Sequence, residues 1–432
     1  MSDNICIFGL GYVGLTLAVA LAVKKIKVVG IENNKEILNK LDKNNSHFYE
    51  PSIDKKIKNI KKKKLFKYYS KIPTNINCST YIITVGTPLN AHGKSRIDLI
   101  KRVTNEIAKV LKNNDLVILR STVQVGTTKN IVYKILNKTK KKFSLCYCPE
   151  RTQEGKALLE IRRLPQLIAG YDKISVQRAN KLFKKITSHS VILKNLETAE
   201  MVKLVDNTYR DVNFAFSNEI SKLCSKINVD VIEVINSGKY KYPRTNLALP
   251  GPVGGPCLTK DTYILNESFK KKYKPIISLT ARLENEKIPQ FIVKYLKERI
   301  NYKKKNKIVL LGLAFKGNPP TSDLRGSVSL DFIKELKQHF KKSDIYGYDN
   351  FLSNKAFSNL KISRLENIKN CFVNTNIILI LNNNIKFSQL NLHKLSKLMS
   401  EEKIIYDCWN LYSKKKIDRK KIPYNSFGNH NY

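Results

Sequence analysis

The sequence has few acidic residues and lacks the features that mark several classes of protein. It contains 35 Asp and Glu against 79 Lys and Arg, which gives a formal net charge of +44. None of its eight cysteines belongs to a Cys-x-x-Cys pair, which argues against a disulfide scaffold or a zinc ribbon. No segment holds about 18 uninterrupted apolar residues, so we expect no signal peptide, no membrane span and a cytoplasmic protein. We also expect no metal site.

The excess of basic charge suggests an anionic partner such as a nucleic acid. The lysines, however, are scattered along the chain in short runs, for example Lys61 to Lys64 and Lys303 to Lys305. Lys, Asn and Ile are all frequent, which indicates compositional drift of the source genome. We therefore expect no specific nucleic-acid partner. A basic nucleic-acid-binding protein with a vestigial dinucleotide fold is the alternative of another class.

The 432 residues are enough for about three domains. Short β-branched runs alternate with helical stretches in two parts of the chain, which is typical of parallel sheets with crossover helices. The first part has candidate strands at Ile5 to Gly9, Lys27 to Glu32, Tyr81 to Val85, Leu116 to Arg120 and Phe143 to Cys148. The second part has them at Ile308 to Gly312, Asp344 to Tyr348, Ile377 to Leu381 and Lys403 to Asp407.

Between these two parts, apolar residues recur every three or four positions from about Leu196 to Ile227, which predicts one long helix. A loop rich in Pro and Gly follows at Pro243 to Pro256. We predict an α/β protein in which two Rossmann-like parallel-sheet domains are joined by a long central helix. The expected domains are residues 1–195, 196–300 and 301–432.

The segment Gly9-Leu10-Gly11-Tyr12-Val13-Gly14 follows the first candidate strand directly and opens an apolar helical run. In this context Gly9 permits a tight turn, Gly11 lets the backbone approach a diphosphate, and Gly14 lets helix and strand pack closely. Glu32 ends the second strand, where a carboxylate accepts the ribose hydroxyls of NAD and repels the phosphate of NADP. The pattern predicts an NAD site.

Two later turns contain Thr87 and Thr122 and follow neighbouring strands, so their hydroxyls should lie at the sheet edge where ligands bind. Each turn alone is also explained as a turn or a helix cap. Gly254-Gly255-Pro256-Cys257 places a cysteine just past paired glycines and near Lys260, which favours a nucleophilic thiol. Most free cysteines are small buried hydrophobic residues, so the local pattern leaves that alternative open.

Over nearly its whole length the sequence resembles the UDP-glucose/GDP-mannose dehydrogenase family. Five segments carry the resemblance in the family's order and spacing: Gly9 to Leu15, Pro149 to Gly155, Lys203 to Asn207, Gly254 to Asp261, and Gly312 to Gly317. The resemblance implies an NAD-dependent dehydrogenase that oxidises the C6 alcohol of a UDP-sugar to a carboxylate, through a thiohemiacetal and a thioester on Cys257. It also implies a homodimer built on the central helices, a UDP-binding C-terminal domain, and an active site in the cleft between the α/β domains.

The resemblance further implies roles for single residues. Lys203 and Asn207, four residues apart on one helix face, would stabilise an alkoxide or oxyanion, and Glu154 would act as a base or position water. Thr122 and Asp261 resemble the pair that holds the catalytic water. Arg325 would contact the cofactor diphosphate, and the substrate would contact Glu150, Arg244, Gly254 and Lys316. Without the resemblance, the charged residues are also explained as solvated surface groups, and for Lys203 that is the favoured explanation.

The sugar is less well defined than the reaction. Cys148-Pro149-Glu150-Arg151 resembles the N-acetylhexosamine branch, whereas the pair Lys260-Asp261 resembles the UDP-glucose branch. We lean to UDP-N-acetylmannosamine or UDP-N-acetylglucosamine, with UDP-glucose 6-dehydrogenase as the alternative and GDP-mannose as a more distant option. A two-electron hydroxyacid dehydrogenase, which needs no cysteine, is the rival enzyme. Trp409 stands where the family commonly has Arg, so contacts from that loop are not carried over.

Overall fold

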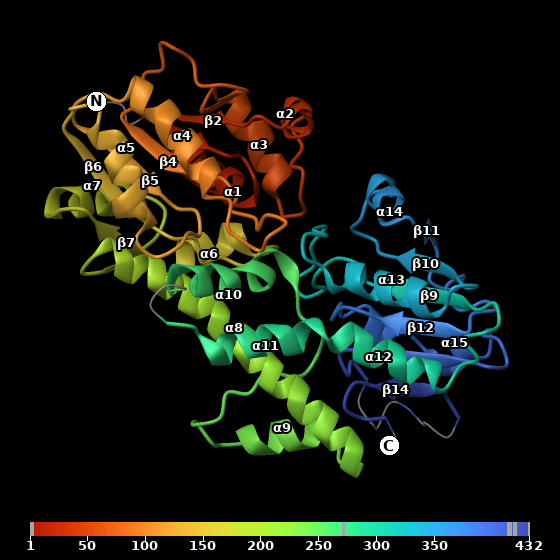
Figure 1. Cartoon of the computed structure of the whole chain (residues 1–432). Coiled ribbons are helices and arrows are strands. Elements are labelled where there is room, and N and C mark those ends of the chain that lie inside the picture. Colours follow the sequence, from red (N-terminus) through yellow and green to blue (C-terminus); the bar gives the residue numbers. More distant parts are fainter. Residues whose placement is uncertain (1–3, 270–272, 413–416, 418–420, 431–432) are drawn as a thin grey trace. The chain divides into compact units, whose positions relative to one another are not determined.

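The structure is a computed structural model of the chain and describes residues 4–269, 273–412, 417 and 421–430 (Figure 1). It divides into two compact units, Met1–Asp206 with Tyr263–Lys274 and Asn207–Thr262 with Pro275–Tyr432. The division falls inside helix α8 (Leu196–Ile227). The bounds of this helix confirm the predicted long helix at both of its ends. The part of this helix from Asn207 to Ile227 and most of the predicted helical middle therefore belong to the second unit.

The first unit is built on an eight-stranded sheet with the order β3-β2-β1-β4-β5-β6-β7-β8. All of its strand pairs are parallel except β6 with β7. In chain order the strands are β1 (Ile5–Phe8), β2 (Val28–Ile31), β3 (Phe66–Tyr69), β4 (Thr80–Ile83), β5 (Asp115–Leu119), β6 (Phe143–Tyr147), β7 (Gln166–Gly170) and β8 (Ser190–Ile192).

Helices cover both faces of this sheet (Figure 1). Successive side chains of a strand point to opposite faces, so Ile5 and Ile7 of β1 enter one hydrophobic core while Cys6 and Phe8 enter the other. The helices are α1 (Tyr12–Val23), α2 (Lys35–Asp42), α3 (Ile53–Lys62), α4 (Ile97–Val110), the short π-helical stretch η1 (Thr128–Tyr133), α5 (Lys134–Asn137), α6 (Ala157–Arg163) and α7 (Lys173–Phe183).

The second unit has its own six-stranded parallel sheet, with the order β11-β10-β9-β12-β13-β14. The strands are β9 (Lys307–Leu311), β10 (Asp344–Tyr348), β11 (Ser363–Arg364), β12 (Ile377–Ile380), β13 (Ile404–Asp407) and β14 (Tyr424–Ser426). The helices are α9 (Val231–Lys239), α10 (Gly255–Phe269), which the unit boundary divides after Thr262, α11 (Ile276–Glu286), α12 (Ile288–Lys297), α13 (Val328–His339), α14 (Asn354–Leu360), the 3₁₀ turn η2 (Phe387–Gln389) and α15 (Leu392–Ser396). This sheet also has a hydrophobic core on each face, with Ile308 and Leu310 in one and Val309 and Leu311 in the other.

The predicted fold class is confirmed, and every predicted strand is present with ends that agree to within two residues. The structure adds β3, β7, β8, β11 and β14, which the sequence pattern did not reveal. Four of these five are the outermost strands of the two sheets. An edge strand is paired on one side only and is shorter or more polar than a central one, so its periodic signal is weak.

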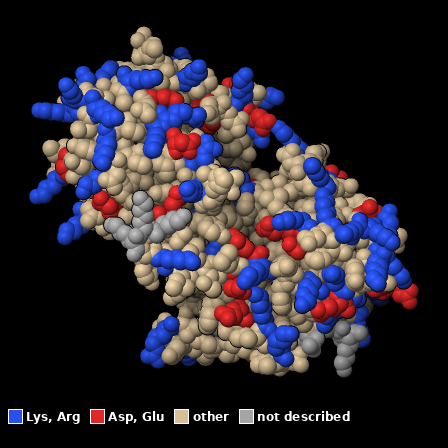
Figure 2. Space-filling model, viewed as in Figure 1, with Lys and Arg blue, Asp and Glu red and all other residues tan. Residues whose placement is uncertain are grey.

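Within the described residues, no helix combines the length and the apolar character needed to cross a membrane. The basic side chains lie dispersed over the face shown in Figure 2, with acidic groups among them, and form no single stripe.

Candidate functional site

The loop after β1 has the geometry of a dinucleotide-binding turn. Gly9 has a φ of 88°, in the region that favours glycine, and its N–H donates to the carbonyl of Ile31 at 2.8 Å. A Cβ on Gly14 would lie 1.8 Å from the carbonyl oxygen of Gly9, so helix α1 can approach the strand only with glycine there. A Cβ on Gly11 would meet nothing within 4 Å. Gly11 is therefore not needed for packing, and the open space beside it suits a diphosphate at the start of α1.

Glu32 lies directly after β2 and holds this loop. Its Oε2 accepts the N–H of Leu10 at 2.8 Å, and its Oε1 accepts the N–H of Asn34 at 2.9 Å. An ionised carboxylate has about four lone-pair positions, so these two bonds leave each oxygen able to accept a ribose hydroxyl. The residues present therefore fit NAD.

Tyr12 in the first turn of α1 is tied to the loop that carries Glu154. Its hydroxyl donates to Oε2 of Glu50 at 2.5 Å, and the N–H of Gly155 donates to the same oxygen at 2.9 Å. Burial, followed by the hydrogen bond to Glu50, raises the pKa of Tyr12 well above its ordinary value. The sequence analysis did not identify Glu50, which precedes Pro51 in an irregular stretch and carried no motif. Glu154 itself is partly exposed.

Glu150 is buried and paired with Arg120 at 2.6 Å. Its other oxygen accepts the N–H groups of Arg151 and Thr152 at 2.9 and 3.0 Å. Burial acts to raise the pKa of Glu150, but Arg120 and these N–H groups hold it below its ordinary value. In this structure Glu150 fixes the shape of the loop, and its role in substrate binding stays a prediction.

The turns after β4 and β5 meet at the carboxyl edge of the sheet, as their positions predicted. The Thr87 hydroxyl donates to the carbonyl of Thr122 at 2.5 Å, and the Ser121 hydroxyl donates to the carbonyl of Val85 at 2.7 Å. Thr122 is partly exposed, whereas Thr87 is buried. Thr87 thus supports the backbone of Thr122 at this edge.

Helix α8 carries Lys203 and Asn207 one turn apart, as predicted. Lys203 is partly exposed and belongs to the first unit, and Asn207 is buried and belongs to the second. The Nδ2 of Asn207 donates to Oδ2 of Asp261 at 2.6 Å, while Lys260 forms an ion pair with Oδ1 of the same carboxylate. Asp261 is fully buried, so the structure brings together two of the residues that the family resemblance singled out.

A second buried contact lies one turn further along α8, where it meets α10 and α11. Asp211 of α8 accepts from Arg282 at 2.9 Å and from Asn285 at 2.8 Å, and the Thr262 hydroxyl of α10 donates to it at 3.3 Å. Arg282 is only 1% exposed. This ion pair, which sequence reasoning missed because its partners are 71 residues apart, joins α8 to α11.

Cys257 occupies the first turn of α10, one turn before Asp261. It is the only one of the eight cysteines that is not buried, and no disulfide joins any of them. Exposure favours the nucleophile over the buried packing residue that the sequence left open. Gly255, with a φ of 93°, donates its N–H to the carbonyl of Gly326 at 2.6 Å, and a Cβ there would lie 2.4 Å from the Phe315 ring. The paired glycines thus let this loop pack closely on the loop after β9.

The three predicted basic contacts of the second unit have partners nearby. Arg325 pairs with Asp323 through two nitrogens, at 2.6 and 2.9 Å. The Arg244 guanidinium lies 4.6 Å from the centroid of the Tyr242 ring, and the Lys316 ammonium lies 5.5 Å from that of Phe315. No group of three or more His, Cys, Asp or Glu among the described residues has the arrangement to hold a metal ion.

Trp409, which stands where the family commonly has Arg, has a packing role. Its indole N–H donates to the carbonyl of Leu381 at 2.9 Å. A Cβ on Gly251 would lie 2.6 Å from the indole ring, so the ring covers the backbone of the loop before Cys257.

Three domain matches cover most of the chain. Residues 3–187 match the NAD binding domain of the UDP-glucose/GDP-mannose dehydrogenase family, residues 197–287 its central domain, and residues 309–414 its UDP binding domain.

Curated relatives agree with these matches. The chain is 34% identical to UDP-N-acetyl-D-mannosamine dehydrogenase of Campylobacter jejuni over 348 residues, which are 77% of this chain and 83% of the relative. It is 30% identical to the Pyrococcus horikoshii enzyme of the same name over 417 residues, 94% of this chain and 96% of the relative.

Solved structures give the same result. The P. horikoshii UDP-D-ManNAc dehydrogenase structure superposes with a TM-score of 0.89 at 28% identity, covering 99% of this chain and 100% of that one. The Staphylococcus aureus UDP-N-acetyl-mannosamine dehydrogenase structure has a TM-score of 0.85 at 26% identity, covering 99% and 98%.

Proposed function

This chain belongs to the UDP-glucose/GDP-mannose dehydrogenase family, and from that premise we propose that it oxidises UDP-N-acetyl-D-mannosamine at C6 to the uronate. It is a nucleotide-sugar dehydrogenase with an NAD-binding domain. The names of the relatives and the Cys148-Pro149-Glu150-Arg151 segment support this sugar. The observation that carries the proposed chemistry is the partly exposed Cys257, one helical turn from the buried Asp261–Asn207 pair.

The residues of the first unit hold the cofactor and the proton acceptor in this proposal. The backbone of Gly9 to Gly14 takes the diphosphate and Glu32 takes the ribose hydroxyls. Bound NAD supplies the acceptor for the hydride that leaves C6. Glu154 or a water held near Thr122 takes the hydroxyl proton, and the Lys203 ammonium stabilises the negative oxygen as it forms.

The residues of the second unit carry the covalent step. Once C6 is an aldehyde, the Cys257 sulfur bonds to it and the carbonyl oxygen gains a proton, which gives a thiohemiacetal. Loss of a second hydride from C6, for which a second NAD bound at the same site would be the acceptor, together with loss of the hydroxyl proton, converts this to a thioester. Water then attacks C6, the carbon–sulfur bond breaks, and the thiol and the carboxylate are released. Asp261 fixes the Asn207 amide, whose second N–H we assign to the oxygen on C6.

The matching test is the substitution Cys257→Ser. We expect uronate formation to fall by about three orders of magnitude or more, since the covalent intermediate is lost. Cys78→Ala, which removes a buried cysteine far from any motif, is the control and should keep its activity. A Cys257→Ser enzyme with unchanged turnover would instead favour the two-electron hydroxyacid dehydrogenase.

The sugar is tested by comparing kcat/KM for UDP-N-acetylmannosamine, UDP-N-acetylglucosamine, UDP-glucose and GDP-mannose. We expect the first to have the highest value. A higher value for UDP-glucose would overturn the proposed substrate while leaving the reaction class intact.

We also propose that the chain forms a homodimer through the part of α8 from Asn207 to Ile227. Tyr209, Phe216, Leu223 and Ile227 are 54, 52, 56 and 69% exposed. The first three are spaced by seven residues, so they form one apolar stripe along the helix. A second copy would remove this stripe from water. We expect light scattering to give twice the chain mass and the double variant Phe216→Asp/Leu223→Asp to give one chain mass. A wild-type monomer would contradict the proposal.

A further inference from the structure

A cavity lies at the carboxyl edge of the second sheet. In this sheet β9 has β10 on one side and β12 on the other, so the loops after β9 and β12 leave in opposite directions and open a crevice where α/β proteins bind ligands. The cavity has a volume of about 180 Å³. It is lined by Tyr348, Asp349, Asn350, Ile368, Asn384, Lys386, Phe387 and Leu390. None of these residues has been assigned to NAD, to the sugar or to the reaction.

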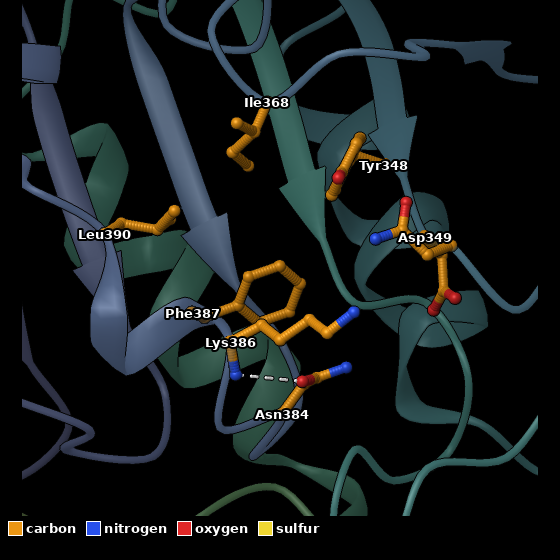
Figure 3. Close-up of a pocket in the computed structure, with 8 residues that line it drawn as sticks. Tyr348, Asp349, Ile368, Asn384, Lys386, Phe387 and Leu390 are labelled. Atoms are coloured by element: carbon orange, nitrogen blue, oxygen red, sulfur yellow. Dashed lines mark hydrogen bonds between the residues drawn. The ribbon is translucent and has the colours of Figure 1, made fainter.

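The walls of the cavity are largely apolar. Figure 3 shows Tyr348, Ile368 and Phe387 facing one another around the space, with Leu390 beside them. Phe387 is only 5% exposed, and its carbonyl accepts a hydrogen bond from the Tyr412 hydroxyl, so this wall is preformed. Sites for drug-sized ligands measure about 300–1,000 Å³, and a cavity of about 180 Å³ therefore suits a single planar ring system.

Asp349 lines the cavity and is buried, but its oxygens are not available to a ligand as those of Glu32 are. Burial raises its pKa, and backbone N–H groups act in the opposite direction. Its oxygens accept hydrogen bonds from the N–H groups of Leu313 at 2.9 Å, Ala314 at 3.1 Å and Phe351 at 2.9 Å, with a further one from Leu352. These four bonds use the roughly four lone-pair positions of a carboxylate. A ribose diol would find no acceptor there.

Polar groups at the rim remain for a ligand. The Asn384 carbonyl oxygen accepts the N–H of Lys386 at 3.0 Å, which orients the amide. The exposed Asn350 also lines the cavity. Lys386 extends its ammonium toward the Asp349 side (Figure 3), where it can pair with an anionic group. The lining therefore offers aromatic walls, two amides and one cation.

We propose that this cavity binds the base of an adenine mononucleotide, with the phosphate paired to Lys386. An Asn amide pairs with the adjacent donor and acceptor of adenine, N6 and N7. Aromatic side chains stack on a base, at about 1–3 kcal/mol per base.

A mononucleotide fits better than a dinucleotide. The helix after β9 begins only at Val328, and the carbonyl of Gly326 just before it is covered by the N–H of Gly255 at 2.6 Å. The diphosphate position of the first unit therefore has no counterpart in the second. The proposal does not depend on the dehydrogenase activity.

The test measures binding of radiolabelled AMP to the full chain by equilibrium dialysis. The background carries Gly11→Val, in which a side chain fills the diphosphate space of the first unit and prevents AMP from binding there. We expect one AMP per chain. Ile368→Trp, which fills the cavity, and Lys386→Glu, which reverses its charge, should each weaken binding about tenfold or more.

Lys394→Glu on α15 is the matched control, because it makes the same charge change at an exposed lysine of the same unit outside the cavity lining. It should leave AMP affinity within about twofold. Thermal unfolding of each variant checks that it folds, and Lys386→Glu keeps the test decisive if Ile368→Trp does not. The proposal is overturned if no AMP binds, if both cavity variants bind as the background does, or if UMP binds as tightly as AMP.

Discussion

The two sheet domains have similar loops after their first strands and similar carboxylates after their second strands, but these groups have different contacts. Each first strand is followed by a glycine of positive φ, Gly9 with 88° and Gly312 with 82°. Each second strand is followed by a carboxylate, and this carboxylate accepts the N–H of the residue after that glycine. Glu32 accepts from Leu10 at 2.8 Å, and Asp349 accepts from Leu313 at 2.9 Å. The two loops therefore share a backbone plan.

The difference lies in what remains available. In the first unit the helix starts at Tyr12, Gly11 faces open space, and Glu32 keeps lone pairs, so the loop can bind a dinucleotide. In the second unit the helix starts at Val328, and Asp349 is saturated by backbone N–H groups. The longer loop instead carries Lys316 and Arg325 and packs against Gly254 and Gly255. One fold thus serves the cofactor in one unit and frames the cysteine loop in the other.

The largest expected effect separates two glycines of the first loop. Gly14→Ala would place a methyl group 1.8 Å from a backbone oxygen, and we expect it to lower the free energy of unfolding by about 3 kcal/mol or more. Gly11→Ala meets no atom within 4 Å and should leave stability unchanged while weakening NAD binding. Denaturant unfolding and calorimetric titration with NAD measure both. Equal stability of the two variants would contradict the assigned roles.

A buried carboxylate of the first unit should make the stability of the fold depend on pH. Glu200 accepts from Gly126 and from Thr128 at 2.5 and 2.8 Å, yet burial raises its pKa to about 7 from 4.5. The folded state therefore holds this proton more tightly than the unfolded state. The resulting contribution to the free energy of unfolding is fully present below pH 4.5 and is lost as the pH rises through 7, by about 3 kcal/mol in total.

Glu200→Gln should remove this loss, as measured by denaturant unfolding at pH 5 and pH 8. Glu219→Gln, at an exposed position further along α8, serves as the control and should retain the wild-type difference. A wild-type slope that persists in Glu200→Gln would assign the pH dependence to another group.

The smallest effect tests the comparison itself. Glu32→Gln and Asp349→Asn each replace one accepting oxygen that faces backbone N–H groups, so each should cost about 1–2 kcal/mol of stability. Only Glu32→Gln should also raise the Kd for NAD, by about tenfold. If Asp349→Asn weakened NAD binding as much, the two carboxylates would not differ in the way their hydrogen bonds indicate.

The sequence predicted the central strands and α8 because buried strands and long amphipathic helices leave strong periodic signals. The short edge strands β11 and β14 were missed, since few of their residues are needed to cover a core. The glycine motif Gly9 to Gly14 was also predicted from the sequence, because only glycine fits certain backbone positions and its spacing is visible in the sequence.

The supporting contacts could not be predicted in the same way. Glu50 meets Tyr12 across 38 residues, and Arg282 meets Asp211 across 71, so only the folded chain defines these pairs. The packing role of Trp409 over Gly251 likewise depends on tertiary structure. Conversely, sequence resemblance identified Asp261 and Asn207, which the structure joins directly at 2.6 Å.

The central claim is a four-electron oxidation through Cys257, and the most direct test counts NADH formed per UDP-N-acetylmannosamine consumed by the purified protein. We expect about two NADH per sugar with the uronate as product, because two hydrides leave C6 before the thioester is hydrolysed. One NADH per sugar with release of an aldehyde would contradict the account and return Cys257 to a structural role.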